Sequence, residues 1–276
     1  MNRLSTAQRA HVVSVLVEGN SLRATARITG VARMTIEKLL RDLGTASKSF
    51  HDRKVRNLSS KRVQCDEIWS FIGAKQKNVP AEKAGAWGDC WTWTALDADS
   101  KLIVSYAVGP RTATMAYDFM KDVAGRLSNR VQLTTDGHRA YLNAVDYAFG
   151  IDVDYAILEK HYGSSASGDS GGVRYSPAKF TGAKRAIVTG SPDKRHISTS
   201  YVERQNLTMR MHMRRFTRLT NAFSKKIEMH EHSVALHFMY YNFGKVHQTL
   251  RVTPAMEAGI ADHVWSIEEI IGVLGA

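Results

Sequence analysis

Apolar side chains recur at helical spacing in three stretches near the start of the chain. A first helix is predicted over 5–18, because Ser5 can cap it and the apolar residues that follow form one stripe. A second helix is predicted over 22–28, and a third over 33–43 that ends at Gly44, since glycine commonly terminates helices. Two short helices separated by a turn fit a helix-turn-helix. A plain three-helix cap with a solvated basic face is the alternative.

The pattern then changes to that of strands. Residues 45–62 are polar and basic without periodicity, which predicts a linker. Strands are predicted over 63–72, 91–96 and 102–108, which are rich in β-branched and aromatic residues, and the turn signal at 97–100 makes the last two a hairpin. Further elements follow in alternation: a helix over 112–127, a strand over 131–135, a helix over 139–149 and a strand over 153–158.

This order predicts an α/β fold, a ribonuclease-H-like mixed five-stranded sheet with flanking helices, preceded by a small all-α helix-turn-helix domain. Regularity fails between His161 and Ser200, where Ser164–Gly172 is a glycine/serine tract. Helical patterns return over 201–216, 222–242, after Thr253-Pro254 and over 267–274. The predicted domains are a helix-turn-helix domain (1–44), a basic linker (45–62), a catalytic domain (63–242) with an insert (163–195), and a C-terminal helical tail (243–276).

The formal net charge of +12 is concentrated in two places. Residues 1–62 hold 13 Lys/Arg against 4 Asp/Glu, and residues 174–226 hold 13 against 2. Clustering of this kind is expected of a protein that neutralises a phosphate backbone, whereas solubility alone does not require it. The candidate DNA contacts are Arg33, Thr35, Lys38 and Arg41 on the third helix, Arg53 and Lys54 in the linker, and Arg214 and Arg215.

Other features exclude several classes of protein. No apolar run approaches the roughly 20 residues needed to cross a bilayer, and Arg3 and Arg9 stand where a signal peptide would be apolar, so we expect a cytoplasmic protein without a membrane partner. Cys65 and Cys90 form no CxxC pair, which argues against a disulfide framework and a cysteine zinc site. His230 and His232 are two residues apart on a predicted helix and point to opposite sides, so a histidine zinc site is not expected.

Asp66 is the first of three candidate metal ligands. Phosphodiester chemistry with two divalent metals about 4 Å apart needs a few converging carboxylates, and Mg²⁺ binds few protein oxygens, so three acids suffice. Asp66 lies inside an otherwise apolar strand, where a carboxylate is costly to bury unless it is paired or binds metal. Glu67 is its rival. Because successive strand residues point to opposite faces, only one of the two is expected to serve one site.

Asp136 and Glu203 are the other two candidate metal ligands. Asp136 follows the fourth predicted strand, where open α/β sheets place ligands, although a strand-end Asp-Gly turn explains it equally well. Glu203 shares a helix stripe with Asn206 and Arg210, beside an apolar stripe. An ordinary surface glutamate paired with a neighbouring arginine is the alternative. His138 and Tyr141 flank Asp136, and they either touch substrate or simply begin the next helix.

Three segments around these acids resemble the active-site blocks of bacterial insertion-sequence DDE transposases. They are Cys65-Asp66-Glu67-Ile68-Trp69-Ser70-Phe71, Thr135-Asp136-Gly137-His138-Arg139-Ala140-Tyr141, and Tyr201-Val202-Glu203-Arg204-Gln205-Asn206 with its continuation to Arg210. The extension Arg214-Arg215-Phe216 and Ile227-Glu228-Met229-His230 is similar to the insertion-sequence-one branch in particular. The resemblance covers residues 60–160 and 200–260.

The resemblance implies a transposase that binds transposon ends and catalyses metal-dependent DNA cleavage and strand transfer, without a covalent protein intermediate. It makes Asp66, Asp136 and Glu203 the ligands of two Mg²⁺ or Mn²⁺ ions, with Asn206 close by and Arg210 as the basic phosphate contact. The partners are transposon-end DNA, target DNA and at least one more copy of the chain, in the bacterial cytoplasm at the nucleoid. The 67-residue gap from Asp136 to Glu203 is wider than the family's commonest spacing, and the role of the insert within it stays open.

Two other functions remain as alternatives. One is a ribonuclease-H-like two-metal DNA nuclease that cuts without joining. The other is a catalytically inactive DNA-binding regulator, against which the retention of all three acids argues. The predicted N-terminal domain favours transposition, because recognition of a defined transposon end requires sequence-specific contacts.

Overall fold

Six strands in the described part of the chain form one mixed sheet. The structure, a computed structural model, describes residues 4–163, 179–217 and 221–275. The strands lie in the order β3-β2-β1-β4-β5-β6, and β1 is antiparallel to β2 but parallel to β4, which places it in the middle. Their bounds are β1 (Arg62–Ile72), β2 (Gly88–Asp97), β3 (Ile103–Gly109), β4 (Val131–Thr135), β5 (Val153–Tyr162) and β6 (Phe180–Thr189).

The first five strands lie where the hydrophobic pattern predicts them. The predicted turn between β2 and β3 is also present, because the Asp97 Oδ1 atom accepts hydrogen bonds from the backbone N–H groups of Asp99 (2.7 Å) and Ser100 (3.1 Å). An aspartate that bonds to backbone groups two and three residues ahead is a common way to reverse a chain. Asp97 and Asp99 are therefore turn residues, as the sequence indicates.

The prediction of only five strands, with no regular structure from 161 to 200, is wrong. β5 continues to Tyr162, and β6 pairs antiparallel with it. No alternation of apolar and polar residues marks β6, because most of its side chains on both faces are exposed. A strand of that kind lacks the period-two signal from which strands are predicted. The glycine/serine tract over 164–172 lies outside the described residues.

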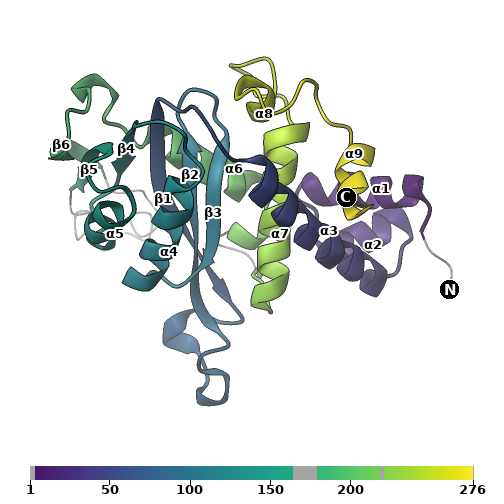
Figure 1. Ribbon diagram of the computed structural model, residues 1–276. Helices are drawn as coiled ribbons and strands as arrows, with labels where there is room; N and C mark the ends of the chain where they lie inside the picture. The colour runs from purple at the N-terminus through teal and green to yellow at the C-terminus, as the bar shows by residue number, and fades with distance from the viewer. Residues whose placement is uncertain (1–3, 164–178, 218–220, 276) are drawn as a thin grey trace.

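Helices cover both faces of the sheet (Figure 1). On one face α4 (Ala113–Ala124) and α5 (Ala140–Phe149) pack against each other, and their residues share a hydrophobic cluster with Val63 and Cys65 of β1. On the other face Ile68 of β1 packs in a second cluster with α6 (Ser200–His212) and α7 (Ile227–Met239). Odd and even residues of β1 thus face different helix layers.

The N-terminal helices are α1 (Thr6–Val17), α2 (Leu22–Thr29) and α3 (Arg33–Lys54). They begin where predicted, with Ser5 in a capping box on α1 and Ser21 capping α2. The prediction that the third helix ends at Gly44 is wrong: α3 continues to Lys54, so only 55–61 separates it from β1. A Cβ atom at Gly44 would lie 2.5 Å from the Cβ of His232 on α7. The glycine therefore allows two helices to pack closely and does not end one.

The C-terminal segment returns to the N-terminal helices. α7 continues as a π-helical turn over Tyr240–Gly244, and the short α8 (Pro254–Glu257) and α9 (Ile267–Gly272) follow. α9 contacts α1, and α7 runs along α3, as Figure 1 shows. Residues of these helices belong to the same hydrophobic cluster as the α4/α5 face of the sheet. No helix in the described ranges is long and apolar enough to span a bilayer.

Candidate active site

Asp66 and Asp136 meet because of the register between β1 and β4. The parallel pairing of these strands ends at Gln64 and Thr134, which lie opposite each other. Asp66 and Asp136 each come two residues later, so the two chains deliver them to the same place. Asp136 directly follows the last residue of β4, and its side chain is 37% exposed. The two aspartates therefore lie on neighbouring strands just beyond the point where the pairing of β1 with β4 ends.

Glu67 joins these two aspartates, which corrects the expectation that only one of Asp66 and Glu67 can serve one site. One oxygen each from Asp66, Glu67 and Asp136 lies within 4.8 Å of the others. The Glu67 side chain is only 2% exposed. The alternation of strand faces does hold, since Asp66 contacts α6 while Glu67 lies near Tyr141 of α5. The carboxylates meet nonetheless, because Asp136 stands at the end of the neighbouring strand and both side chains reach it.

Crowding and burial make the ionised forms of Asp66 and Glu67 costly. Burial, then the nearby Asp136 charge, raises the pKa of Asp66 to about 7, although hydrogen bonds from the Glu67 backbone and from Asn206 oppose the shift. Burial and Asp136 likewise raise the pKa of Glu67 to about 7, against the opposing effects of Tyr141 and Arg111. A divalent cation would favour the ionised forms of both.

The Asp66 carboxylate has a fixed orientation. Its Oδ1 atom accepts a hydrogen bond from the backbone N–H of Glu67 (2.8 Å), and its Oδ2 atom accepts one from Nδ2 of Asn206 on α6 (2.8 Å). Asn206 is buried, and its Oδ1 atom has no hydrogen-bond partner among the described residues. The amide thus ties the central acid to the helix that carries Glu203.

Asp136 is held from two sides. Its Oδ1 atom accepts a hydrogen bond from the backbone N–H of His138 (2.9 Å), and its Oδ2 atom lies 3.4 Å from Nη2 of Arg111. The same Arg111 nitrogen is 3.2 Å from Oε2 of Glu67. Arg111 lies between β3 and α4, and no local sequence pattern marks it as a site residue.

Glu203 lies near the beginning of α6, and β1 positions that helix. Oε1 of Gln64, two residues before Asp66, accepts hydrogen bonds from the backbone N–H groups of Tyr201 (2.9 Å) and Val202 (3.2 Å). These are among the first N–H groups of the helix, which have no partner within the helix. Gln64 therefore caps α6 and sets Glu203 next to the acids of β1.

The Glu203 carboxylate is engaged by other groups. Nζ of Lys160, on β5, lies 2.5 Å from each of its oxygens, and the Thr199 hydroxyl donates to its Oε1 atom (2.6 Å). The glutamate is 40% exposed, and it is not part of the acid cluster of Asp66, Glu67 and Asp136 found in the described residues. Arg210, half-buried, lies further along the same helix. Arg111, Lys160 and Gln64 are the neighbours that sequence reasoning missed as site residues, whereas the sequence indicates Glu67 only as an alternative to Asp66.

The residues of this cluster fit a hard divalent cation. Mg²⁺ and Mn²⁺ take carboxylate and amide oxygens, and Mg²⁺ usually keeps several waters beside one or two carboxylates. The buried Oε1 atom of Glu67 has no hydrogen-bond partner in the described part of the chain, and a buried acceptor without a partner is costly. A cation between Asp66, Glu67 and Asp136 would satisfy that atom and offset the mutual repulsion.

The candidate DNA contacts lie apart from this cluster on exposed surface, with one exception. Arg33, Thr35, Lys38 and Arg41 on α3 are exposed, as are Arg53 and Lys54 at its end and Arg214 after α6. Lys38 pairs with Asp42 at 2.5 Å. Arg215 is the exception, because it is half-buried and donates a hydrogen bond to the Ser224 hydroxyl (2.9 Å). Burial lowers the pKa of Arg215 to about 10.

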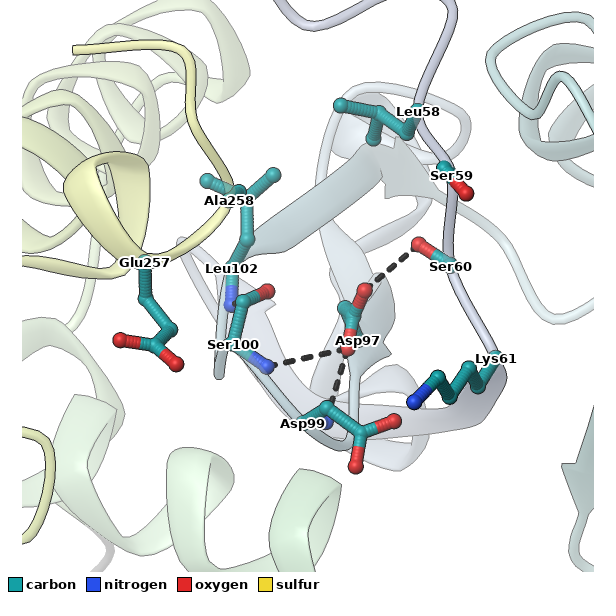
Figure 2. A pocket seen from close by; sticks show the side chains of 10 residues that line it. All are labelled: Leu58, Ser59, Ser60, Lys61, Asp97, Asp99, Ser100, Leu102, Glu257 and Ala258. Carbon is teal, nitrogen blue, oxygen red and sulfur yellow. Dashed lines mark hydrogen bonds between the residues drawn. The ribbon is translucent and has the colours of Figure 1, made fainter.

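A pocket elsewhere on the molecule is structural in character. It lies between the segment that leads into β1, the β2–β3 turn and α8, and Figure 2 shows Asp97 at its centre. Asp97 accepts a hydrogen bond from the Ser60 hydroxyl (2.6 Å) in addition to the two backbone bonds of the turn. Its carboxylate is satisfied by these groups, so nothing in the pocket duplicates the acid cluster at the end of β4.

Comparison with known proteins finds similarity to transposases. The family model for IS1 transposase matches residues 186–243, the range that contains α6 and α7. The chain is 24% identical over 169 residues to the insertion element iso-IS1n protein InsB of Shigella dysenteriae, a match that covers 61% of this chain and 86% of that protein. A solved structure of the piggyBac transposase synaptic complex with hairpin DNA aligns with a TM-score of 0.45 and 12% identity, over 98% of this chain and 69% of that one.

Proposed function

We propose that the chain is an IS1-like DDE transposase, which binds the two ends of an insertion element, cuts them with the help of divalent metal ions, and joins them to target DNA. The similarity to the IS1 transposase family over residues 186–243 and to InsB supports this proposal. The observation that carries this proposal is the meeting of Asp66, within β1, and Asp136, at the end of the neighbouring β4, with Asn206 tying Asp66 to the helix of Glu203. Two metals held by a few carboxylates in an open site are what phosphoryl transfer between DNA strands needs.

The catalytic domain in this proposal is a ribonuclease-H-like unit over 63–242. Its support is the sheet order, in which three antiparallel strands are followed by two parallel ones with helices on both faces. The N-terminal helices α1 to α3 act as the helix-turn-helix domain that recognises the element ends, with the exposed basic residues of α3 toward DNA. Arg53 and Lys54, in the last turn of α3, contact the DNA backbone.

The roles of the site residues follow from their surroundings. Asp66, Asp136 and Glu203 would hold two Mg²⁺ or Mn²⁺ ions, which when bound activate the attacking oxygen and stabilise charge on the phosphate. Asn206 orients the Asp66 carboxylate, and the backbone N–H of His138 orients that of Asp136. Arg210, which shares one face of α6 with Glu203, contacts a phosphate of the DNA. Arg214 and Arg215, which follow α6, contact further phosphates of the same DNA.

Transposition brings two ends together, so the proposed active form contains at least two copies of the chain. Its place of action is the bacterial cytoplasm, on DNA of the nucleoid. The oligomer is tested by the mass of the complex on DNA that carries two ends, where a single copy would count against this part of the proposal.

The function is tested with purified protein and labelled duplexes taken from both sides of the coding region, where an insertion element carries its ends. With Mg²⁺ or Mn²⁺ we expect end cleavage and a joined product. Cleavage without joining would leave a nuclease, and end binding without either product would leave a regulator.

Two active-site variants and one control complete the test. Asp66→Ala and Glu203→Ala should abolish both products while end binding persists. Asp118→Ala removes an exposed acid from α4, away from the site, and should keep full turnover. Unchanged turnover in either active-site variant would refute the assignment of these acids.

A further inference from the structure

Two basic side chains contact the acids of the candidate active site. Lys160 on β5 places its Nζ 2.5 Å from both oxygens of Glu203. Arg111, between β3 and α4, places one nitrogen 3.2 Å from Glu67 and 3.4 Å from Asp136. Each candidate metal-binding acid other than Asp66 therefore has a protein cation in contact with it.

These contacts put the basic groups in competition with metal. A divalent ion and an ammonium or guanidinium group that share one carboxylate repel each other at contact distance, and in a partly buried site this repulsion is weakly screened. An ion that binds Glu203 must therefore displace Lys160, at least in part. The same holds for Arg111 when an ion binds between Glu67 and Asp136.

The side chains of Lys160 and Arg111 can move toward solvent when an ion displaces them. The side chains of Lys160 and Arg111 are 24% and 38% exposed, so both reach solvent from their present positions. They approach the acids from opposite sides of the sheet centre, because in the strand order β3 lies on one side of β1 and β4 while β5 lies on the other. A DNA backbone that crosses the acids would meet one cation on each side, and both groups bind phosphate well.

We propose that Lys160 and Arg111 exchange partners between the site's carboxylates and the DNA backbone. Without metal they pair with the acids, and when a divalent ion binds those acids they contact phosphates beside the scissile bond. The inference rests on the proposed function and adds two phosphate-contacting residues to it. It makes metal and DNA binding cooperative, since each ligand removes a competitor of the other, and such coupling is reciprocal.

The first test measures Mn²⁺ binding by titration calorimetry and by the Mn²⁺ spin-resonance signal, without DNA. Lys160→Gln and Arg111→Gln should each bind Mn²⁺ tighter, by about fivefold or more, at the low end of the usual coupling range. Lys184→Gln is the matched control, because it removes the same charge from the paired strand β6 without touching Glu203. Unchanged or weaker binding in both variants, or equal tightening in the control, would overturn the inference.

The second test measures binding of an element-end duplex with and without Ca²⁺. Lys160→Gln and Arg111→Gln should lose DNA affinity mainly when Ca²⁺ is present, and each should lower the salt slope there by about 1. Lys160→Arg keeps the charge and should recover most of the affinity. A loss of equal size with and without Ca²⁺ would show that the groups contact DNA independently of metal, and it would refute the sharing.

The variant Asp66→Asn separates this inference from the proposed function. It should weaken Mn²⁺ binding, because it removes a central carboxylate. If it does not, the metal site itself is misplaced and the proposed function fails. If it does, while Lys160→Gln and Arg111→Gln bind Mn²⁺ like the unaltered protein, the site stands and the sharing of the two cations fails.

Discussion

Replacing Asp66 by asparagine should stabilise the folded protein at pH 8 while it removes a metal ligand. Burial and the Asp136 charge raise the pKa of Asp66 from 3.8 to about 7. One pKa unit corresponds to about 1.4 kcal/mol, so ionised Asp66 costs the fold up to about 4 kcal/mol. Relaxation around the charge reduces the measured effect, and we expect a gain of about 1–3 kcal/mol from a neutral isostere.

The gain should depend on pH in a defined direction. A folded-state pKa above the unfolded value means that the folded protein binds the proton more tightly between pH 4 and 7. The stability that this proton contributes is full below pH 4 and is lost as pH rises through about 7. Asparagine resembles the protonated acid, so the variant should match the unaltered protein at pH 4 and below, exceed its stability increasingly between pH 4 and 7, and keep a constant advantage above that.

The assay is urea unfolding of both proteins at several pH values between 5 and 8, without divalent metal. Asp154→Asn is the control, because a hydrogen bond from Arg130 lowers the pKa of Asp154 and its ionised form is the favoured one. That variant should be no more stable than the unaltered protein at pH 8. Added Mg²⁺ should stabilise the unaltered protein, since a ligand that binds only the folded state does so, and the Asp66→Asn variant much less.

Two results would refute this reasoning. If Asp66→Asn raises the free energy of unfolding by the same amount at pH 5 and pH 8, a cause other than burial of the charge is responsible. A variant less stable than the unaltered protein at pH 8 would mean that the hydrogen bonds from Glu67 and Asn206 outweigh the cost of burial, and that the site is relaxed without metal.

Three further changes probe how the site and the fold are built. Glu67→Gln should weaken Mn²⁺ binding about tenfold or more in titration calorimetry, since groups around a metal commonly have effects of that size; an unchanged affinity would exclude Glu67 from the ion site. Gln64→Ala removes the cap of α6, so the rate of end cleavage should fall strongly while the melting temperature falls only slightly. A fall in cleavage that the loss of folded protein fully accounts for would make the role of Gln64 merely structural. Gly44→Ala should cost about 1–3 kcal/mol in urea unfolding by overpacking, whereas Gly272→Ala, with open space around it, should cost nothing.

The positions of β1 to β5 and the starts of the first helices could be predicted from the sequence because their signals are local. β1 to β5 carry β-branched and aromatic runs with turn residues between them, and Ser5 and Ser21 cap α1 and α2. The end of α3 could not be predicted from the sequence, because Gly44 has the same local signature whether it terminates a helix or lets α7 approach. Only the partner helix, almost 190 residues away in sequence, decides between the two.

The candidate site was predictable to the same extent. An acid inside an apolar strand is a local feature, and it singles out Asp66. Asp136 at a strand end is explained equally well by an Asp-Gly turn, so it is indicated mainly by the resemblance to the transposase blocks. The partners of each acid are not local: Arg111 and Lys160 come from other elements, and Glu67 joins the cluster only because Asp136 ends the neighbouring strand. Alternation of side chains along a strand fixes the face of Glu67, but it does not limit how far a carboxylate reaches at an open strand end.

The wide gap between Asp136 and Glu203 has a physical explanation in the contact between β1 and α6. Gln64 and Asp66 are two residues apart and share one face of β1; Gln64 caps the start of α6, and Asp66 accepts a hydrogen bond from Asn206 within it. The helix that carries the third acid is thus held by the strand that carries the first one. Lengthening a connection whose two ends are fixed costs little free energy, because the closure cost grows only with the logarithm of its length. A segment of unusual length before α6 is therefore compatible with the site, and shortening it without changing Gln64 or Asn206 should leave the spacing of the acids intact.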